Sequence, residues 1–285
     1  KLARYCGHQG TADFTNALLR KIGSMQGAIV YPSWEQKPGS HLAFKYSFPL
    51  WVVELWINWL GREETLQLCR AFNQRPEMHL RANTLRVTPQ EVASHFMNLG
   101  ADVTPGSFTP EIVKVKPGSL AVRDSWLKQG KYYIQDESSA LAAHALGVQP
   151  GHLVYDLCSA PGGKATHLGQ LMENRGRILA IDADPRRILR VEENARRLGI
   201  TIIETRKADA SKELNLKPAP RVLVDAPCTG WGTIRKRPDL RWRKKPSDVA
   251  KLIQIQRKIL SRAARCVQKG GLLLYSTCTI NKGEN

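Results

Sequence analysis

The sequence predicts an α/β fold whose main part is a parallel sheet with helices on both faces. Five short apolar runs follow one another in the second half of the chain, and helical segments separate most of them. This alternation is typical of strand–helix–strand units that pair in parallel. An apolar fraction of 42% is enough for a packed core rather than a disordered chain. The five runs are residues 152–158, 177–182, 201–206, 221–226 and 271–277.

Length and charge bound the function before any motif is considered. The 285 residues suffice for about two domains. Lysine and arginine number 43 against 25 acidic residues, which gives a formal net charge of +18. Such an excess suggests a polyanionic partner, most simply nucleic acid. The alternative is a soluble protein that is merely basic.

Cysteine usage and hydropathy exclude several other classes. None of the 6 cysteines forms a CxxC pair, so we expect no metal site. The low cysteine density fits a reducing cytoplasm, and no secretory signal is visible. The most apolar stretch, 48–60, is interrupted by Glu54 and Asn58 and is too short for a membrane span. We therefore expect a cytoplasmic monomer without membrane contact. Because the chain begins at a lysine rather than a methionine, it resembles part of something longer.

The first 70 residues read as helical. Helices are predicted over about 11–22, 49–59 and 62–72, and the stretch 23–40, rich in glycine, proline and serine, is predicted to be a linker. The apolar face of the first helix carries Phe14, Leu18 and Ile22.

A small mixed unit is predicted next. Residues 78–83 alternate apolar and polar side chains, as a half-buried strand does. Thr88 and Glu91 have the spacing of a capping box, and Gly100 ends the helix that they begin. Further short strands are predicted near 111–115 and 119–122. The unit suits RNA contact, although a purely structural module fits it equally well.

A glycine-rich turn follows the first apolar run. The sequence DLCSAPGGK occupies residues 156–164, and a helix is predicted to open near Lys164. Two glycines without side chains let backbone N–H groups approach a ligand closely. The spacing is not the GxGxxG fingerprint, so a nicotinamide dinucleotide is not favoured. The alternative is an ordinary tight turn from strand to helix.

Acidic residues stand at the ends of the next runs. Asp182 is placed to bind the two hydroxyls of a ribose, and Asp209 could accept from the exocyclic amine of an adenine. Asp225 could hold the amino group of a methionine moiety or face the substrate. An adenosine ligand without a pyrophosphate motif suggests S-adenosylmethionine. Asp184, by contrast, is expected to cap the helix that Pro185 begins. The buried stripe of that helix is predicted to comprise Ile188, Val191, Ala195 and Leu198.

Two cysteines occupy equivalent places in the predicted sheet. Cys228, in DAPCTG, ends the fourth run, and Cys278, in YSTCT, ends the fifth. In a sheet of order 3-2-1-4-5 these strands are neighbours, so the two thiols could face one cleft. A single buried cysteine is more often inert packing. Cys266 lies in a helical pattern and is expected to be structural.

A strongly basic segment follows the first of these cysteines. Residues 231–246 interleave Trp231 and Trp242 with seven cations and a single acid, Asp239. Cations can hold phosphates, and aromatic rings can stack on unpaired bases. The alternative is a solvated loop whose tryptophans lie in the core. The residues predicted to bind RNA are Arg235, Lys236, Arg237, Arg241, Arg243 and Trp231.

Three motifs of the chain stand in the order DLCSAPGGK, DAPCTG and YSTCT. In this order they resemble the motifs of the S-adenosylmethionine-dependent RNA cytosine-5 methyltransferases of the Nop2/Sun superfamily. More closely, the chain resembles the bacterial Sun/Fmu-type enzymes that methylate 16S ribosomal RNA. The stretches 73–85 and 133–146 match as well, and 10–22 looks like the end of the NusB-like helical domain of that family. The resemblance covers nearly the whole chain. It differs in a serine within CSAPGGK and a glycine within NKGEN.

The resemblance implies an organisation in three parts. These are a helical remnant of the NusB-like domain with linker helices over 1–70, a small α/β RNA-binding domain over 71–135, and a Rossmann-like methyltransferase domain over 136–285 that lacks the C-terminal strands of the family. Remaining alternatives for the function are a tRNA cytosine-5 methyltransferase and a non-catalytic RNA-binding factor in ribosome assembly.

The resemblance also implies roles for single residues. Cys278 is the expected nucleophile, adding to carbon 6 of cytosine, because carbon 5 alone is a poor nucleophile. Cys228 is implicated in release of the product, and Asp225 lies near the methionine end of the cofactor and the cytosine. The cofactor site it implies comprises Cys158, Ser159, Ala160, Pro161, Gly162, Gly163, Lys164, Asp182, Asp209 and Asp225.

Overall fold

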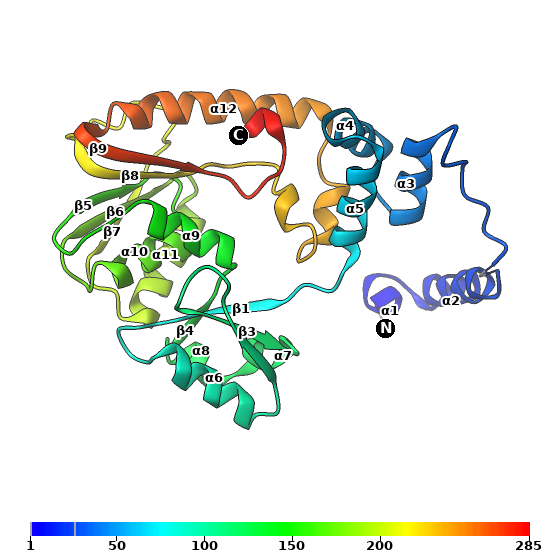
Figure 1. Cartoon of the computed structure of the whole chain (residues 1–285), viewed down its shortest axis with the longest axis horizontal. Helices are drawn as coiled ribbons and strands as arrows, with labels where there is room; N and C mark the ends of the chain where they lie inside the picture. Colours follow the sequence, from blue (N-terminus) through cyan, green and yellow to red (C-terminus); the bar gives the residue numbers. More distant parts are fainter. Residues whose placement is uncertain (1, 26) are drawn as a thin grey trace. The chain divides into compact units, whose positions relative to one another are not determined.

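The computed structural model describes residues 2–25 and 27–285. The chain divides into two compact units, residues 1–73 and residues 74–285, and each is described here by itself (Figure 1). Among the described residues, no helix is both long and apolar enough to cross a membrane.

The first unit is helical. The predicted helices 49–59 and 62–72 are confirmed within one or two residues, whereas α3 falls partly within the segment predicted to be a linker. Pro38 occupies the first turn of α3, where its missing N–H costs no hydrogen bond, so the proline that suggested a linker in fact begins a helix. The helices are α1 (Leu2–Cys6), α2 (Gln9–Ser24), α3 (Pro38–Tyr46), α4 (Leu50–Leu60) and α5 (Arg62–Asn73).

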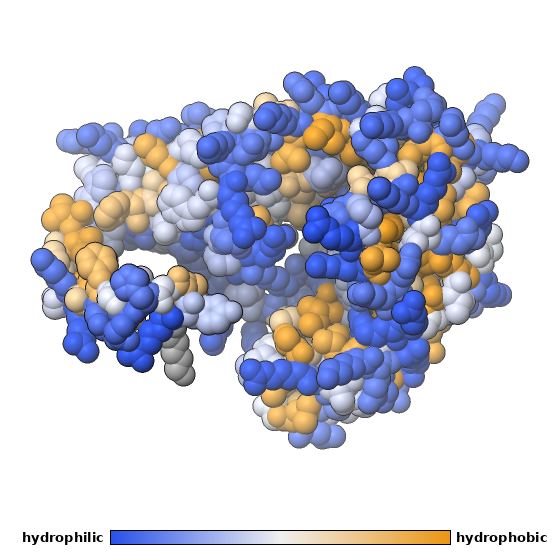
Figure 2. All heavy atoms as spheres, turned by 180° about the vertical axis from the view of Figure 1, so that it is seen from behind, coloured by the Kyte–Doolittle hydropathy of each residue, from blue (hydrophilic) through white to orange (hydrophobic). Residues whose placement is uncertain are grey.

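Helix α2 has the predicted amphipathic pattern, but the unit does not bury it. Phe14 is 70% exposed, and Leu18 and Ile22 are each 46% exposed. Figure 2 shows hydrophobic atoms among hydrophilic ones over this N-terminal part, at the left of the view. The core of the unit lies instead in α4 and α5, where Trp56 packs edge-on against Phe48 with ring centroids 5.2 Å apart.

The second unit begins with a small antiparallel sheet of order β2-β3-β1-β4. The predicted capping box is confirmed, because Thr88 accepts from the Glu91 backbone and Glu91 accepts from the Thr88 backbone. The strand predicted near 119–122 is wrong: this stretch forms α7, a short helix that buries only Ala121. The elements are β1 (Met78–Ala82), α6 (Pro89–Asn98), β2 (Asp102–Pro105), β3 (Ile112–Lys116), α7 (Ser119–Arg123), α8 (Ser125–Lys128) and β4 (Tyr132–Ile134).

A parallel sheet of five strands forms the rest of this unit, with order β7-β6-β5-β8-β9. This order is the predicted 3-2-1-4-5, so the fold is Rossmann-like, and the fourth and fifth strands are neighbours. The strands are β5 (Leu153–Asp156), β6 (Arg177–Asp182), β7 (Ile203–Lys207), β8 (Ala219–Asp225) and β9 (Val267–Ser276). The helices are α9 (Glu137–Ala145), α10 (Gly163–Leu171), α11 (Pro185–Leu198) and α12 (Pro246–Ala264), with 3-10 turns η1 (Trp231–Thr233), η2 (Pro238–Arg241) and η3 (Lys282–Glu284).

Side chains alternate between the two faces of this sheet, and helices cover both (Figure 1). On one face, Val222 and Val224 pack with Ile259 and Ala263 of α12. On the other face, Leu223 packs in a cluster to which α9 and α10 contribute. Both faces are thus apolar, which is why the strands read as continuous apolar runs.

Helix α11 matches its prediction in detail. Asp184 caps it by accepting from the backbone N–H of Arg186, and Pro185 stands in its first turn. Gly199 ends it in the left-handed region, with φ +72. The four residues predicted to form its stripe are buried: Ile188, Val191, Ala195 and Leu198.

Candidate active site at the carboxyl ends of the strands

A cavity of about 710 Å³ opens at the carboxyl ends of the parallel strands. Ligands bind at this edge in open α/β sheets, next to the point where the strand order reverses. The lining residues include predicted site residues from the first strand end, the fourth and the fifth, together with one cation of the basic segment: Ser159, Pro161, Gly163, Lys164, Asp225, Cys278 and Arg237. Several predicted residues do not line it: Cys158, Ala160, Gly162, Asp182, Asp209 and Cys228.

The turn between β5 and α10 places backbone groups at this cavity. Gly162 has φ +96, a conformation that other residues rarely adopt, and a Cβ there would lie 3.1 Å from the Cα atom of Val191. Helix α10 begins directly after it, so its first N–H groups face the turn. Burial raises the pKa of the Cys158 thiol strongly, and this cysteine is therefore an inert thiol within the turn.

Asp182 fixes the turn from the neighbouring strand. Its Oδ2 accepts from the backbone N–H of Ala160 at 3.1 Å, and its Oδ1 accepts from the backbone N–H of Asp184 at 3.0 Å. Asp209 lies beyond the end of β7 and accepts from both the backbone and the hydroxyl of Ser211. Asp182 is thus integrated into the turn, while Asp209 serves a local turn of its own.

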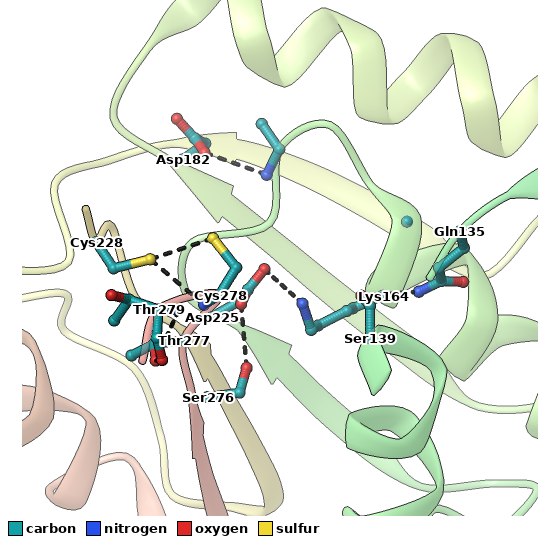
Figure 3. Close-up of polar contacts among 12 residues, drawn as sticks. Gln135, Ser139, Lys164, Asp182, Asp225, Cys228, Ser276, Thr277, Cys278 and Thr279 are labelled. Atoms are coloured by element: carbon teal, nitrogen blue, oxygen red, sulfur yellow. Dashed lines mark hydrogen bonds and ion pairs between the residues drawn. The ribbon is translucent and has the colours of Figure 1, made fainter. Parts of the chain in front are cut away.

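The two cysteines predicted to share a cleft lie in contact (Figure 3). Their Sγ atoms are 3.2 Å apart, and the backbone N–H of Cys278 lies 3.4 Å from the Cys228 sulfur. Cys278 is exposed and Cys228 is half-buried. The hydrogen bond from the Cys228 thiol lowers the pKa of Cys278 against the effect of burial, and the charge of Lys164 lowers it further. The same bond raises the pKa of Cys228. Of the two sulfurs, Cys278 is therefore the one that loses its proton more readily.

A charged pair lies beside the sulfur atoms. Lys164 Nζ is 2.8 Å from Asp225 Oδ2, and the Ser276 hydroxyl donates to Asp225 Oδ1 at 3.0 Å (Figure 3). Lys164 comes from the start of α10, Asp225 from the end of β8 and Ser276 from the end of β9. Three separate elements therefore converge on one carboxylate. Deeper in the sheet, burial and the nearby charge of Asp225 together raise the pKa of Asp156 to about 7.

A buried carboxylate that the sequence analysis did not single out braces the loop of Cys228. Glu284 is 3% exposed and accepts from the backbone N–H of Thr229 at 2.8 Å and from its hydroxyl at 2.7 Å. Gln256 of α12 also donates to it. The loops of the two cysteines are joined by a bond from Gly232 N–H to the Cys278 carbonyl, so close that a Cβ at Gly232 would lie 2.9 Å from that oxygen. In the sequence, the acid within NKGEN was the feature that could have indicated this buried carboxylate.

The basic segment divides into buried and exposed side chains. Trp231 is 0% exposed and Arg241 is 9% exposed, so both side chains are buried, and RNA binding by these two stays a prediction. Trp231 enters the core because Gly230, with φ +74, turns the chain inward before η1. Trp242, by contrast, is 61% exposed. Aromatic stacking is thus available from Trp242 rather than Trp231.

The remaining predicted RNA contacts have surface positions with partners of their own. Lys236 pairs with Asp136, and Arg243 Nε lies 2.9 Å from Asp239 Oδ2. Arg235 donates to the Arg75 carbonyl at 2.8 Å. Arg237 is exposed and lines the cavity. Of these four residues, only Arg237 lines the cavity.

A second group that the sequence analysis missed ties the small sheet to the glycine-rich turn. Arg81 of β1 is 1% exposed, and its Nη1 donates to the Gly163 carbonyl at 2.7 Å and to Gln135. Its Nη2 donates to the Thr166 hydroxyl at 3.1 Å. A fully buried arginine needs such partners because its charge cannot be lost by deprotonation. No local pattern distinguishes it from a solvent-facing arginine on a strand.

Comparison with known proteins identifies relatives over the whole chain. A family described as 16S rRNA methyltransferase RsmB/F matches residues 143–285, and a family described as the RsmF/B-like ferredoxin-like domain matches residues 48–120. The chain is 38% identical, over 100% of its length, to the probable ribosomal RNA small subunit methyltransferase B of Bacillus subtilis. It is 35% identical, again over 100% of its length, to the protein of the same name from Synechocystis. It spans 64% of the length of each of these two relatives.

Solved structures agree on the fold. A methyltransferase homologue from Pyrococcus horikoshii superposes with a TM-score of 0.74 at 28% identity, covering 86% of this chain and 78% of that one.

Proposed function

Because the chain belongs to the RsmB/F family of 16S rRNA methyltransferases, we propose that it transfers a methyl group from S-adenosylmethionine to carbon 5 of a cytosine in 16S ribosomal RNA. One observation carries the proposal. Cys278 Sγ lies 3.2 Å from Cys228 Sγ at the cavity that Lys164 and Asp225 also line. A paired thiolate and thiol beside a carboxylate suit an addition and elimination on a pyrimidine ring.

The glycine-rich turn fits an adenosine ligand that carries a sulfonium. Gly162 and Gly163 leave the backbone open at the start of α10, and Asp182 holds the turn in place through Ala160. When bound, S-adenosylmethionine supplies an electrophilic methyl group. We assign the turn from Cys158 to Lys164, with Asp182, to binding of this ligand. Asp209 belongs to the same proposed site, although its carboxylate already accepts from Ser211.

Cys278 is the proposed nucleophile. Its thiolate forms a bond to carbon 6 of the cytosine, and the electrons of the ring double bond make carbon 5 nucleophilic. Carbon 5 then takes the methyl group. Asp225, held by Lys164 and Ser276, hydrogen-bonds the polar edge of the base during this addition. The exposure of Cys278 and its lowered pKa support this role.

Cys228 is the proposed group for product release. After transfer, Cys228, having lost its own proton to solvent once Cys278 is bonded to carbon 6, takes the proton from carbon 5. The electron pair of that bond restores the ring double bond while the bond between Cys278 and carbon 6 breaks and returns the thiolate. Cys228 is adjacent to that bond and is half-buried, which keeps it from competing as the nucleophile. The division of roles therefore follows from the different surroundings of two neighbouring sulfurs.

RNA would approach along the basic segment. The exposed Arg237 and Arg243 offer cations for phosphates, and the exposed Trp242 offers a ring for stacking. The reacting atoms belong to a base ring, so the target cytosine must be unpaired or flipped out to reach Cys278.

The direct test is methyl transfer by the complete gene product that contains these 285 residues. It is incubated with S-adenosylmethionine labelled in the methyl group and with unmethylated 16S ribosomal RNA or bulk tRNA, and the RNA is digested to nucleosides. Labelled 5-methylcytidine from the ribosomal RNA alone is the expected result. Label only in tRNA would overturn the substrate, and label in another nucleoside would overturn the chemistry. Absence of both transfer and S-adenosylhomocysteine binding by calorimetry would favour a non-catalytic RNA-binding factor.

A further inference from the structure

Three potential metal ligands converge away from the cavity. Glu111 immediately precedes β3, His144 lies in α9 and His167 lies in α10. Glu111 Oε1 is 2.8 Å from Nε2 of His144 and 2.8 Å from Nε2 of His167, and the three ligand atoms all lie within 4.8 Å of one another. We propose that these three side chains bind one divalent transition-metal ion. The site links the small sheet to α9 and to α10, the helix whose first turn carries Lys164.

The donor set suits such an ion. Two imidazole nitrogens and one carboxylate oxygen are typical ligands of first-row metals, and they form a facial set that leaves other positions for water. Although burial opposes ionisation of Glu111, its contacts with His167 and His144 lower its pKa to about 2. Burial lowers the pKa of His167 to about 4.

His144 Nε2 makes an ordinary hydrogen bond to Glu111 Oε1, whereas His167 approaches the same oxygen from another direction. His167 is 0% exposed, and neither ring nitrogen has a hydrogen-bond partner among the described residues, although Nε2 lies 2.8 Å from Glu111 Oε1. The oxygen thus lies off the N–H direction of the ring. Two donors each about 2.1 Å from one ion and separated by 2.8 Å subtend roughly 85° at it, close to the cis angle of octahedral coordination. A shared cation accounts for such an off-axis approach.

The surroundings define what the ion would do. None of the three ligands lines the cavity at the strand ends, so the ion is not part of the proposed chemistry. The nearest cation is Arg81, whose charge lowers the pKa of His167 and opposes metal binding. Its Nη atoms, however, are already hydrogen-bonded to Gln135, Gly163 and Thr166. The expected role is structural: the ion fixes the start of β3 against α9 and α10. The expectation that the chain binds no metal rested on cysteine spacing and did not consider these histidines.

Cobalt provides a direct test, because Co²⁺ bound to nitrogen and oxygen ligands absorbs visible light. The full chain, freed of metal by a chelator, is titrated with Co²⁺ alone. We expect a visible band that saturates at one ion per chain and a rise in the thermal midpoint of unfolding. Sulfur-to-cobalt charge transfer in the near ultraviolet would reveal binding by Cys228 and Cys278 instead. A wild-type chain that gives neither the band nor the thermal shift overturns the proposal and leaves a hydrogen-bonded cluster.

Variants localise the site. Glu111→Gln keeps the shape of the side chain, and His144→Ala removes a half-buried ligand, so both should fold, as far-ultraviolet circular dichroism will check. Each is expected to abolish the Co²⁺ band and the thermal shift. His152→Ala, in the same unit but outside the cluster, is the matched control and should retain both. If Glu111→Gln and His144→Ala bind Co²⁺ as the control does, the proposal is wrong.

Discussion

The loops that follow β8 and β9 occupy equivalent places and yet treat their cysteines differently. Each loop continues from the carboxyl end of its strand, and the two sulfurs are 3.2 Å apart. Cys278 is exposed and has a lowered pKa, whereas Cys228 is half-buried and has a raised pKa. The fold brings the two thiols together, but the residues around each loop determine which thiol has the lower pKa. Topology alone therefore does not assign their roles.

The largest effect is expected from removing the thiolate. Cys278→Ala should reduce methyl transfer by on the order of 10⁴-fold or more, because no other group would form the bond to carbon 6. The rate of label incorporation into ribosomal RNA measures it. Cys266→Ala, a buried thiol at the start of β9, is the control and should keep most of the activity. Substantial transfer by Cys278→Ala would mean that the two cysteines have the opposite roles.

Removing the partner thiol should block a later step. Cys228→Ala should still add Cys278 to the cytosine and accept the methyl group, but release should fail. A protein–RNA complex that survives denaturing gel electrophoresis is therefore expected. The double variant Cys228→Ala with Cys278→Ala should give no such complex. A complex formed by Cys278→Ala instead would reverse the assignment.

A moderate effect with a pH signature is expected from Lys164→Met. The charge of Lys164 lowers the pKa of Cys278, so its removal raises that pKa and leaves less thiolate at a given pH. Transfer should rise with pH in both proteins, with the limb of the variant displaced to higher pH. The rate deficit should thus be roughly 10–100-fold at neutral pH and smaller in alkali, since one pKa unit is a tenfold change in thiolate. If the rates of the two proteins rise over the same pH range, without displacement, Lys164 acts only by holding Asp225.

The smallest effect should come from the brace of the Cys228 loop. Glu284→Gln places an amide N–H₂ where the Glu284 carboxylate accepts from Thr229 and Gln256, and a buried mismatch of this kind costs about 1–3 kcal/mol. A lower thermal midpoint and slower product release are expected, with adduct formation by Cys278 little changed. Glu213→Gln, at an exposed ion pair, is the control. Equal loss in adduct formation and release would show that the two loops act as one unit.

Much of the parallel sheet and its helices could be predicted from sequence because the residue patterns that indicate them are local. The capping residues and apolar stripe of α11, the strand order and the meeting of Cys228 with Cys278 all follow from periodicity and the rules of parallel sheets. The helix α7 was read as a strand because the four residues 119–122, with three consecutive apolar side chains, are too few to separate the two periods.

Which side chains of the site are buried could not be predicted from sequence, because tertiary packing determines it. Trp231 and Trp242 are both tryptophans within one basic segment, and only the turn at Gly230 puts the first in the core. Arg81 and Glu284 look like solvent-facing charges in sequence, but partners far along the chain bury them. Burial by partners that lie far along the chain does not produce a periodic pattern in the sequence.

The buried Arg81 means that the glycine-rich turn, the proposed cofactor site, depends on a side chain from another part of the chain. A guanidinium from the small sheet supplies the donor for the Gly163 carbonyl, so excising that sheet would remove the donor and open the side of α10 to water. A shortened protein that keeps only the parallel sheet and its helices would therefore also lack part of the proposed ligand site. Domain shuffling within this scaffold is restricted for the same reason: the small sheet and the turn it contacts have to be exchanged together.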